Sequence, residues 1–205
     1  QDAIKNGAFK DEIAPVTVKD RKGERVVDTD EGPGKINIDK IPTLKPAFKK
    51  DGTVTAASSS SINDGAAAMV LMRASTAARL GCAPLARIAA HATHAQEPEW
   101  FSTAPIGATQ KALAKAGWQV GEVDLWEINE AFAVVPMALM HDLQVPHDKV
   151  NVNGGACALG HPIGASGARI MVTLMHALKA RGLKKGLATL CIGGGEATAL
   201  ALEML

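Results

Sequence analysis

The chain has 205 residues, 47% of them hydrophobic, and a formal net charge of +1. A nearly neutral chain cannot neutralise many phosphates, and an aromatic content of 3% offers few stacking surfaces, so a nucleic-acid partner is not expected. No run approaches the ~20 apolar residues that cross a bilayer, so no membrane segment is expected. Cys82, Cys157 and Cys191 are few and widely spaced, which predicts reduced thiols in a cytoplasmic protein.

Residues 1–62 are rich in charge, glycine and proline, which is typical of a solvated, loop-rich segment. Alternating valines predict short exposed strands around residues 16–18 and 26–27. A lid that reaches over a ligand is the alternative interpretation. The segment ends in TVTAASSSSINDG, residues 53–65, which could be a flexible linker or could present hydroxyls and amides to a polar ligand.

The rest of the chain alternates between strand-like and helix-like patterns, which predicts an α/β fold with a largely parallel sheet covered on both sides. The continuous apolar run at residues 65–72 predicts a strand buried on both faces. Further strands are expected at residues 85–95, 123–128, 150–152, 187–192 and 197–205. Helices are expected at residues 74–80, 105–116, 130–143 and 165–180, with glycine stops at residues 81 and 117. The short turn at residues 193–195 requires the last two strands to be antiparallel.

The stretch from Asn151 to Arg169 contains five glycines and one histidine, His161. Glycine loses more backbone freedom on folding than any other residue, so this density indicates close approach of the backbone to a ligand or to another segment. A histidine held in such a turn is typical of a general base near neutral pH, although a lone histidine is more often structural. The sequence therefore predicts that His161 lies at the edge of an active site.

Two other strand ends have polar residues where an α/β sheet usually places its chemistry. Asn129, in NEAFA, could cap the following helix or hold a water or a substrate carbonyl. Cys191 precedes three glycines, and the bare amide of Gly193 suits an oxyanion hole, whereas a buried cysteine by itself is usually inert. A phosphate loop is disfavoured because no Lys-Ser/Thr follows the glycines, and paired spacing for a metal site is missing, so no metal is expected.

NEAFA, then GGACALGHPIGASGAR, then CIGGG, in this order, resemble the C-terminal half of thiolases, and more narrowly of biosynthetic acetyl-CoA acetyltransferases. INDGAAA, DEIAPV and GTVTA fit the same family, so the resemblance covers essentially the whole chain. It implies a thiolase-like α/β fold with a mixed, mostly parallel five-stranded sheet between helices and part of a loop domain. Residues 1–62 would end that loop domain, 63–84 would be the last strand and helix of the N-terminal domain, and 85–205 would form the C-terminal domain.

The resemblance also implies a reaction, the Claisen condensation of two acetyl-CoA molecules to acetoacetyl-CoA and CoA, and its reversal. In the family's scheme His161 activates a nucleophilic cysteine and helps to bind the enolate oxygen, and Asn129 anchors a water that completes this oxyanion hole. Cys191 takes the α proton, and the Gly193 amide serves the second oxyanion hole. Coenzyme A thioesters are substrates, and no separate cofactor is implied.

Four residues are expected by the same resemblance to contact the substrate. Ser60 matches a contact of the pantetheine arm, although Ser58 to Ser61 stand where the family usually has Asn-Ala-Ser-Gly. Ala131 and Phe132 would border that arm. Phe101 stands where a flexible methionine often lines the acyl pocket, and its rigid ring is expected to favour short acyl chains.

The family's acyl-accepting cysteine belongs to the N-terminal half, which this chain does not contain, and Cys82 lacks the surrounding motif. The chain begins at Gln1 in what resembles the middle of a helix, so the missing half is expected in the same native polypeptide. The chain alone is expected to be inactive. The resemblance also implies a homotetramer, a dimer of dimers.

Two alternatives remain open from the sequence. A degradative 3-ketoacyl-CoA thiolase shares all of these motifs and differs in substrate length. A non-catalytic acyl-CoA- or lipid-binding module on the same fold is disfavoured, because a binder needs none of Asn129, His161 and Cys191.

Overall fold

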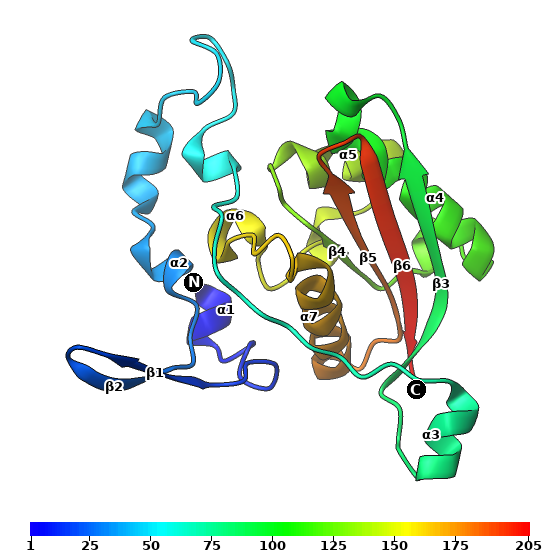
Figure 1. The fold of residues 1–205 in the computed structure, drawn as a ribbon. Helices are drawn as coiled ribbons and strands as arrows, with labels where there is room; N and C mark the ends of the chain where they lie inside the picture. The colour runs from blue at the N-terminus through cyan, green and yellow to red at the C-terminus, as the bar shows by residue number, and fades with distance from the viewer.

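The computed structural model describes residues 1–205, and Figure 1 shows a sheet flanked by helices with an arm of short elements beside it. The arm contains an antiparallel hairpin formed by β1 (Val16–Asp20) and β2 (Gly23–Val27). The main sheet has the order β3-β6-β5-β4. Its four strands are β3 (Ala86–Ala95), β4 (Leu125–Ile128), β5 (Lys185–Ile192) and β6 (Glu196–Met204). The short exposed strands predicted near residues 16 and 26 are confirmed.

The main sheet is mixed, as predicted, but the expectation of a mostly parallel, five-stranded sheet is wrong. β6 pairs antiparallel with both β3 and β5, and only β4 with β5 is parallel. The expected strand at residues 150–152 contributes only isolated parallel bridges, Val150 with Trp126 of β4 and Val152 with Gly154. The ladder stops there because the backbone of Asn151 turns to φ 46° and its side chain, rather than its main chain, bonds both polar groups of Ile128.

The α-helices are α1 (Asp2–Lys5), α2 (Glu31–Lys35), α3 (Ala74–Leu80), α4 (Ala104–Ala116), α5 (Val134–Leu143), α6 (Ala156–Leu159) and α7 (Ser166–Arg181). The 3-10 turns are η1 (Ile38–Thr43), η2 (Ala56–Ser58), η3 (Pro98–Thr103), η4 (Val120–Glu122) and η5 (His147–Lys149). Left-handed glycines end α3, α4 and α7, and the predicted stops at Gly81 and Gly117 are confirmed. No helix combines the length and the apolar character needed to cross a membrane.

The core has one layer on each side of the sheet. On one side, α4 and α5 pack against Trp126 and Ile128 of β4 and against β6. Buried alanines on the facing sides of α4 and β6 allow this helix to lie close to the sheet. On the other side, Leu174 and Leu178 of α7 pack on Leu125 and its neighbours. Side chains alternate between the two faces of a strand, so residues 125 and 127 of β4 point towards α7, whereas residues 126 and 128 point towards α4 and α5.

The predicted buried strand at residues 65–72 is wrong. The segment is extended but pairs with no strand, and Val70 is 87% exposed. Met69 alone packs against the core beside α7, and the segment passes that helix on its way to α3 (Figure 1). An apolar run specifies burial only where neighbouring strands supply hydrogen-bond partners, and no strand of this chain lies beside it.

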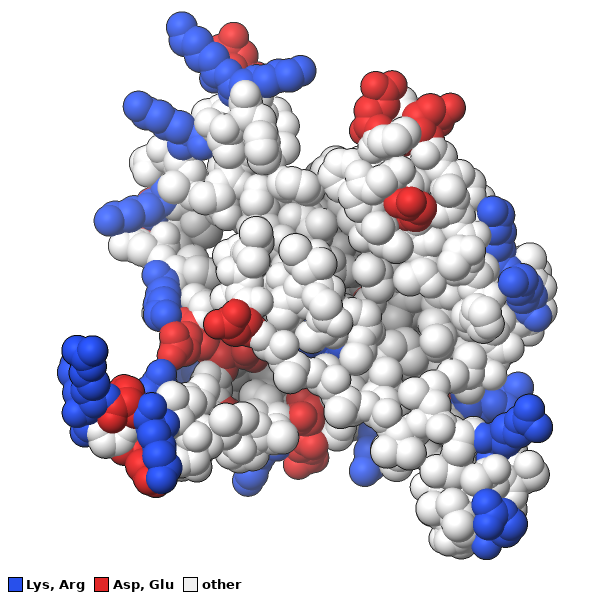
Figure 2. All heavy atoms as spheres, viewed as in Figure 1, with Lys and Arg blue, Asp and Glu red and all other residues white.

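Charged side chains lie mainly towards the margins of the face in Figure 2, with both signs mixed and few at its centre. The arm formed by residues 1–58 is largely exposed, with Phe9 and Pro33 as its buried side chains. This agrees with the predicted solvated, loop-rich segment.

We expect Gly186→Ala to destabilise the protein by about 1–3 kcal/mol, because the added methyl overpacks the helix–sheet interface. A Cβ at this buried position would lie 2.8–2.9 Å from Leu178 Cδ1 and from Leu174 Cδ2 and Cγ. Urea denaturation measures the change. Gly121→Ala is the matched control, since a Cβ there meets nothing within 4 Å, and an equal loss in both variants would contradict the packing argument.

Candidate active site

The parallel pair β4–β5 brings two of the predicted residues to one edge of the sheet. Ile128 pairs with Thr189, and the Asn129 amide donates to the Thr189 carbonyl at 2.9 Å. Asn129 therefore leaves the end of β4 beside the end of β5, where Cys191 follows two residues after Thr189. Strand pairing alone places this amide and this thiol at the same edge.

Asn129 is fully buried, and its side chain contacts His161. The distance between Asn129 Nδ2 and His161 Nε2 is 3.5 Å, whereas Asn129 Oδ1 is buried with no hydrogen-bond partner. The interpretation of Asn129 as a helix cap is wrong, because α5 begins at Val134 and its N-cap is Ala133. A buried acceptor without a partner is rare, so Oδ1 is suited to accept from a bound water.

His161 is held by a second residue, Ser166. His161 Nδ1 lies 2.5 Å from Ser166 Oγ, and Ser166 Oγ donates to the Pro162 carbonyl at 3.1 Å. Because the single hydroxyl proton goes to the carbonyl, Nδ1 must be the donor to Oγ, which leaves Nε2 with a free lone pair facing Asn129. Burial, and secondarily the charge of Arg169, lowers the pKa of His161, so the ring is neutral at neutral pH and can accept a proton.

The sequence analysis missed Ser166. Its position could have indicated the contact, because Ser166 lies five residues after His161 at the start of the predicted helix. The first turn of α7 directs the Ser166 hydroxyl back to the imidazole.

The serine segment connects the Asn129 loop to the His161 loop. Ser60 donates both its amide and its hydroxyl to the Ala131 carbonyl at 3.0 Å, and Ser59 forms an antiparallel bridge with Phe132. The Ser61 carbonyl accepts from the His161 amide at 2.8 Å. The flexible-linker interpretation of this segment is therefore wrong, because cross-chain backbone bonds fix it on both loops.

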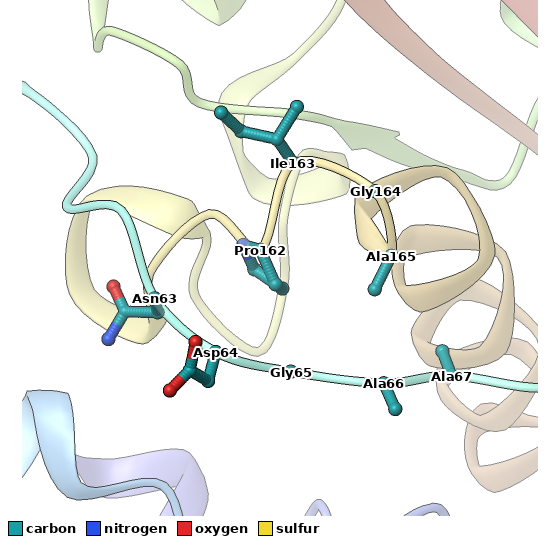
Figure 3. Close-up of a pocket in the computed structure, with 9 residues that line it drawn as sticks. All are labelled: Asn63, Asp64, Gly65, Ala66, Ala67, Pro162, Ile163, Gly164 and Ala165. Carbon is teal, nitrogen blue, oxygen red and sulfur yellow. The ribbon is translucent and has the colours of Figure 1, made fainter.

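A hollow of approximately 510 Å³ opens beyond His161, between residues 63–67 and residues 162–165 (Figure 3). None of the four predicted catalytic residues lines it. Gly160, at φ +98°, lies so close to this segment that a Cβ would be 2.3 Å from Asn63 Oδ1. Only glycine allows the His161 loop to approach the INDG segment this closely.

Cys191 lies at the end of β5 and is 7% exposed. Burial raises the pKa of its thiol, and Cys191 makes no hydrogen bond to His161. The amides of Gly193 and Gly194 donate no hydrogen bond within the chain, and a Cβ at Gly193 would meet nothing within 4 Å. A Cβ at Gly194 would instead lie 2.6 Å from Glu196 Oε2, so the space is open at Gly193 alone. The free Gly193 amide can bind an oxyanion.

Aromatic rings gather beside the Asn129 loop. The predicted substrate contacts Phe101 and Phe132 meet edge to face with centroids 6.3 Å apart. Phe48, from the N-terminal arm, approaches the same Phe132 ring at 6.0 Å. Sequence analysis did not predict Phe48, because nothing in its local pattern shows that the arm folds back over this loop.

Glu130 organises the loops below the site. Its carboxylate accepts from Asn151 Nδ2 at 2.8 Å and from the Cys157 amide at 3.0 Å. A Cβ at Gly155 would lie 2.2 Å from this carboxylate, so glycine is required there. Burial raises the pKa of Cys157 to about 12, and the thiol is therefore unreactive.

A buried acid lies behind the Asn129–His161 contact. Glu127 is 2% exposed, and its Oε2 lies 3.5 Å from Arg169 Nη1 of α7. Glu12 from the N-terminal arm accepts from Thr173 Oγ1 at 2.9 Å and faces the same group of charges. Burial raises the pKa of Glu127 to about 8 even though Arg169 acts in the opposite direction. No three histidine, cysteine, aspartate or glutamate side chains are arranged to hold a metal ion.

A neutral imidazole, a buried thiol and the free Gly193 amide form an arrangement suited to acyl transfer. The family model "Thiolase, C-terminal domain" matches residues 82–204, and "Thiolase, N-terminal domain" matches residues 1–75. The chain belongs to the thiolase family.

The chain is 54% identical over 205 residues to the acetyl-CoA acetyltransferase of Paracoccus denitrificans, covering 98% of this chain and 52% of that protein. It is 55% identical over 203 residues to the acetyl-CoA acetyltransferase of Chromobacterium violaceum, with the same coverage. The chain thus spans about half the length of the relatives that it matches.

Two solved structures show the same fold over all of this chain and 52% of their own. The Bacillus anthracis acetyl-CoA acetyltransferase is 47% identical with a TM-score of 0.95. The human mitochondrial 3-ketoacyl-CoA thiolase is 37% identical with a TM-score of 0.91.

We expect Glu127→Gln to change how stability depends on pH. The folded pKa of Glu127 is about 8, above its reference value of 4.5, so between these pH values the folded protein holds a proton that the unfolded chain has lost. This group therefore lowers the free energy of unfolding by about 1.4 kcal/mol per pH unit as the pH rises. The variant lacks this term, so it should gain stability relative to the parent protein between pH 5 and pH 8.

Denaturation at several pH values measures this difference. Glu99→Gln, an exposed position in η3, makes the same change where the carboxylate forms no ion pair, and this control should run parallel to the parent. A constant difference between Glu127→Gln and the parent at every pH would contradict a protonated buried acid.

Proposed function

We propose that the polypeptide to which this chain belongs is an acetyl-CoA C-acetyltransferase, which condenses two acetyl-CoA molecules to acetoacetyl-CoA and CoA and catalyses the reverse thiolysis. The observation that supports this most directly is the His161 ring, with Nδ1 committed to Ser166 and Nε2 free beside Asn129. The 54–55% identity to acetyl-CoA acetyltransferases supports the same choice of reaction.

The first half of the proposed reaction is acyl transfer to a cysteine outside this chain, in the half that the relatives have in addition. His161 Nε2 takes the proton of that thiol, and the sulfur attacks the thioester carbonyl of acetyl-CoA. The carbon–sulfur bond to CoA then breaks, and CoA leaves with the proton. The neutral state of His161 suits this role as a base.

The second half forms the carbon–carbon bond. His161 Nε2 first takes the proton of the Cys191 thiol, and the Cys191 thiolate then takes an α proton from a second acetyl-CoA. The enolate oxygen is stabilised by the Nε2–H of the resulting imidazolium and by a water on Asn129 Oδ1. The enolate carbon attacks the acetyl-cysteine, the Gly193 amide binds the tetrahedral oxyanion, and expulsion of the cysteine sulfur yields acetoacetyl-CoA. Because burial raises the pKa of Cys191, its thiol needs this transfer to a base before it can act. The His161 imidazolium then gives the proton to the departing cysteine sulfur, which returns all groups to their starting states.

Substrate binding and assembly belong to the same proposal. Ser60, Ala131 and Phe132 border the pantetheine arm, and Phe101 limits the acyl pocket. The other half of the polypeptide covers the exposed apolar residues 65–72, the enzyme is a homotetramer, and its three free cysteines fit a cytoplasmic location.

A degradative 3-ketoacyl-CoA thiolase is the second candidate, since the human enzyme of that name shares the fold. Its lower identity of 37%, against 47% for the bacterial acetyltransferase, favours the first. Thiolysis of acetoacetyl-CoA compared with longer 3-ketoacyl-CoA substrates separates them, and equal rates would contradict the short-chain proposal.

We expect Cys191→Ala in the full-length protein to lower the rate of acetoacetyl-CoA formation by at least about a thousandfold while CoA binding is retained, because the α proton loses its acceptor. Steady-state assays and calorimetric titration with CoA measure the two properties. Cys82→Ala, at an exposed position just after α3, is the matched control. Unchanged turnover in Cys191→Ala would favour the non-catalytic binding module instead.

We expect kcat/KM for thiolysis to have an acidic limb with an apparent pKa below 6.5, because burial and Arg169 both lower the pKa of His161 and only the neutral ring accepts a proton. Removal of the Arg169 charge in Arg169→Gln should shift this limb to higher pH. The measurement is a pH–rate profile of both proteins. A limb that does not move, or that moves to lower pH, would contradict the assignment of His161 as the base.

A further inference from the structure

Gln96 immediately follows β3 and joins two turns of the proposed active site. Its side-chain Nε2 donates to the Trp100 carbonyl at 2.6 Å and to Thr103 Oγ1 at 2.8 Å. Its main-chain amide donates to the Gly195 carbonyl at 3.0 Å. One residue thus contacts both the η3 turn, which bears Phe101, and the glycine turn after Cys191.

The orientation of the Gln96 amide follows from its partners. The Trp100 carbonyl can only accept, so the group that faces it must be the NH2. Both amide hydrogens are then used, and Oε1 accepts from His94 Nε2 at 3.2 Å. All polar atoms of the side chain are satisfied in this one arrangement.

The packing on both sides of Gln96 leaves little freedom. Gly195 has φ +98°, and a Cβ there would lie 2.3 Å from the Gln96 carbonyl oxygen. On the other side, a Cβ at Gly107 would lie 2.7 Å from the His94 ring. Glycine at these two positions lets the glycine turn and α4 close onto the His94–Gln96 pair.

Phe101 depends on this arrangement for its position. It is half-buried in η3, where the backbone at Trp100 departs from helical geometry, and its ring meets Phe132. Thr103 Oγ1 also donates to the Trp100 carbonyl at 3.0 Å, so the turn closes around Gln96 Nε2. A short turn with an irregular backbone retains one shape only where side chains supply the missing bonds.

We propose that Gln96 is a positioning residue that sets the acyl chain length of the substrate, by fixing the Phe101 turn against the glycine turn of the oxyanion hole. The inference rests on the proposed thiolase reaction and extends it to a residue outside the three sequence motifs. A fixed Phe101 ring closes the acyl pocket beyond a short chain. A loosened turn allows the ring to move aside and admits longer 3-ketoacyl-CoA thioesters.

The test uses Gln96→Glu in the full-length protein, which retains the shape of the side chain but replaces both donated hydrogens with an acceptor facing a carbonyl. We expect the ratio of kcat/KM for acetoacetyl-CoA to kcat/KM for 3-ketohexanoyl-CoA to fall about tenfold, in the range by which pockets discriminate added methylenes. Amide hydrogen exchange of residues 97–104 should become faster. Gln110→Glu, on the exposed side of α4, makes the same chemical change away from the site and should leave both unchanged.

Thr103→Val provides a second variant, which removes one acceptor of the Gln96 amide with little change of volume, and it should shift both measurements in the same direction by less. If Gln96→Glu does not fold, Thr103→Val tests the positioning role and the specificity role by the same two measurements. Unchanged exchange in the turn would overturn the positioning role. Faster exchange with an unchanged substrate ratio, or an equal fall of both rates, would overturn the specificity role.

The hydrogen exchange does not depend on activity. Absence of thiolysis in the parent protein would therefore contradict the proposed function and the specificity role with it. The exchange of residues 97–104 would still show whether Gln96 fixes the turn.

Discussion

The parallel pairing of β4 with β5 is the constraint on which the site depends. It is the single parallel pair among the four strands of the sheet, and it brings the carboxyl ends of two strands to one edge. Asn129 and Cys191 lie at those ends, although they are 62 positions apart in the sequence. The antiparallel β6 then returns through the glycine turn, which places the free amides beside the same thiol. The pairing of β4, β5 and β6 therefore brings Asn129, Cys191 and the glycine turn together without any contact between their side chains.

Close backbone approach is the second requirement. Gly155, Gly160 and Gly195 each occupy a position where a Cβ would lie within 2.3 Å of Glu130, Asn63 or Gln96. These contacts tie the Asn129, His161 and Cys191 loops to their supporting segments. Since such loops carry no regular ladder, side chains and single bridges satisfy their backbone instead, as Asn151 and Ser61 do. The resulting rigidity positions His161 with one ring nitrogen committed and the other free.

Local patterns predicted most of the secondary structure. The helices ending at Gly81 and Gly117, the exposed hairpin near Val16, and the final antiparallel pair occur where spacing and turn glycines indicated them. The prediction of a buried strand at residues 65–72 was wrong, because an apolar strand is buried only where neighbouring strands lie beside it, and the residues of the segment do not specify those neighbours. The prediction of a mostly parallel sheet was wrong for a related reason. A strand buries the same side chains whether its neighbour runs parallel or antiparallel, so the hydrophobic pattern does not specify the direction of pairing.

The sequence by itself determined the residue types that the chemistry needs, their order, and the family to which they belong, because glycine turns and motif spacing are local properties. Only the tertiary structure decided which groups support them: Ser166 on the His161 ring, Ser61 on its backbone, Glu127 behind the site, and Gln96 between two turns. These partners are remote in the sequence or have unremarkable neighbours. Their roles arise from the distances that packing imposes, and a linear pattern contains no measure of those distances.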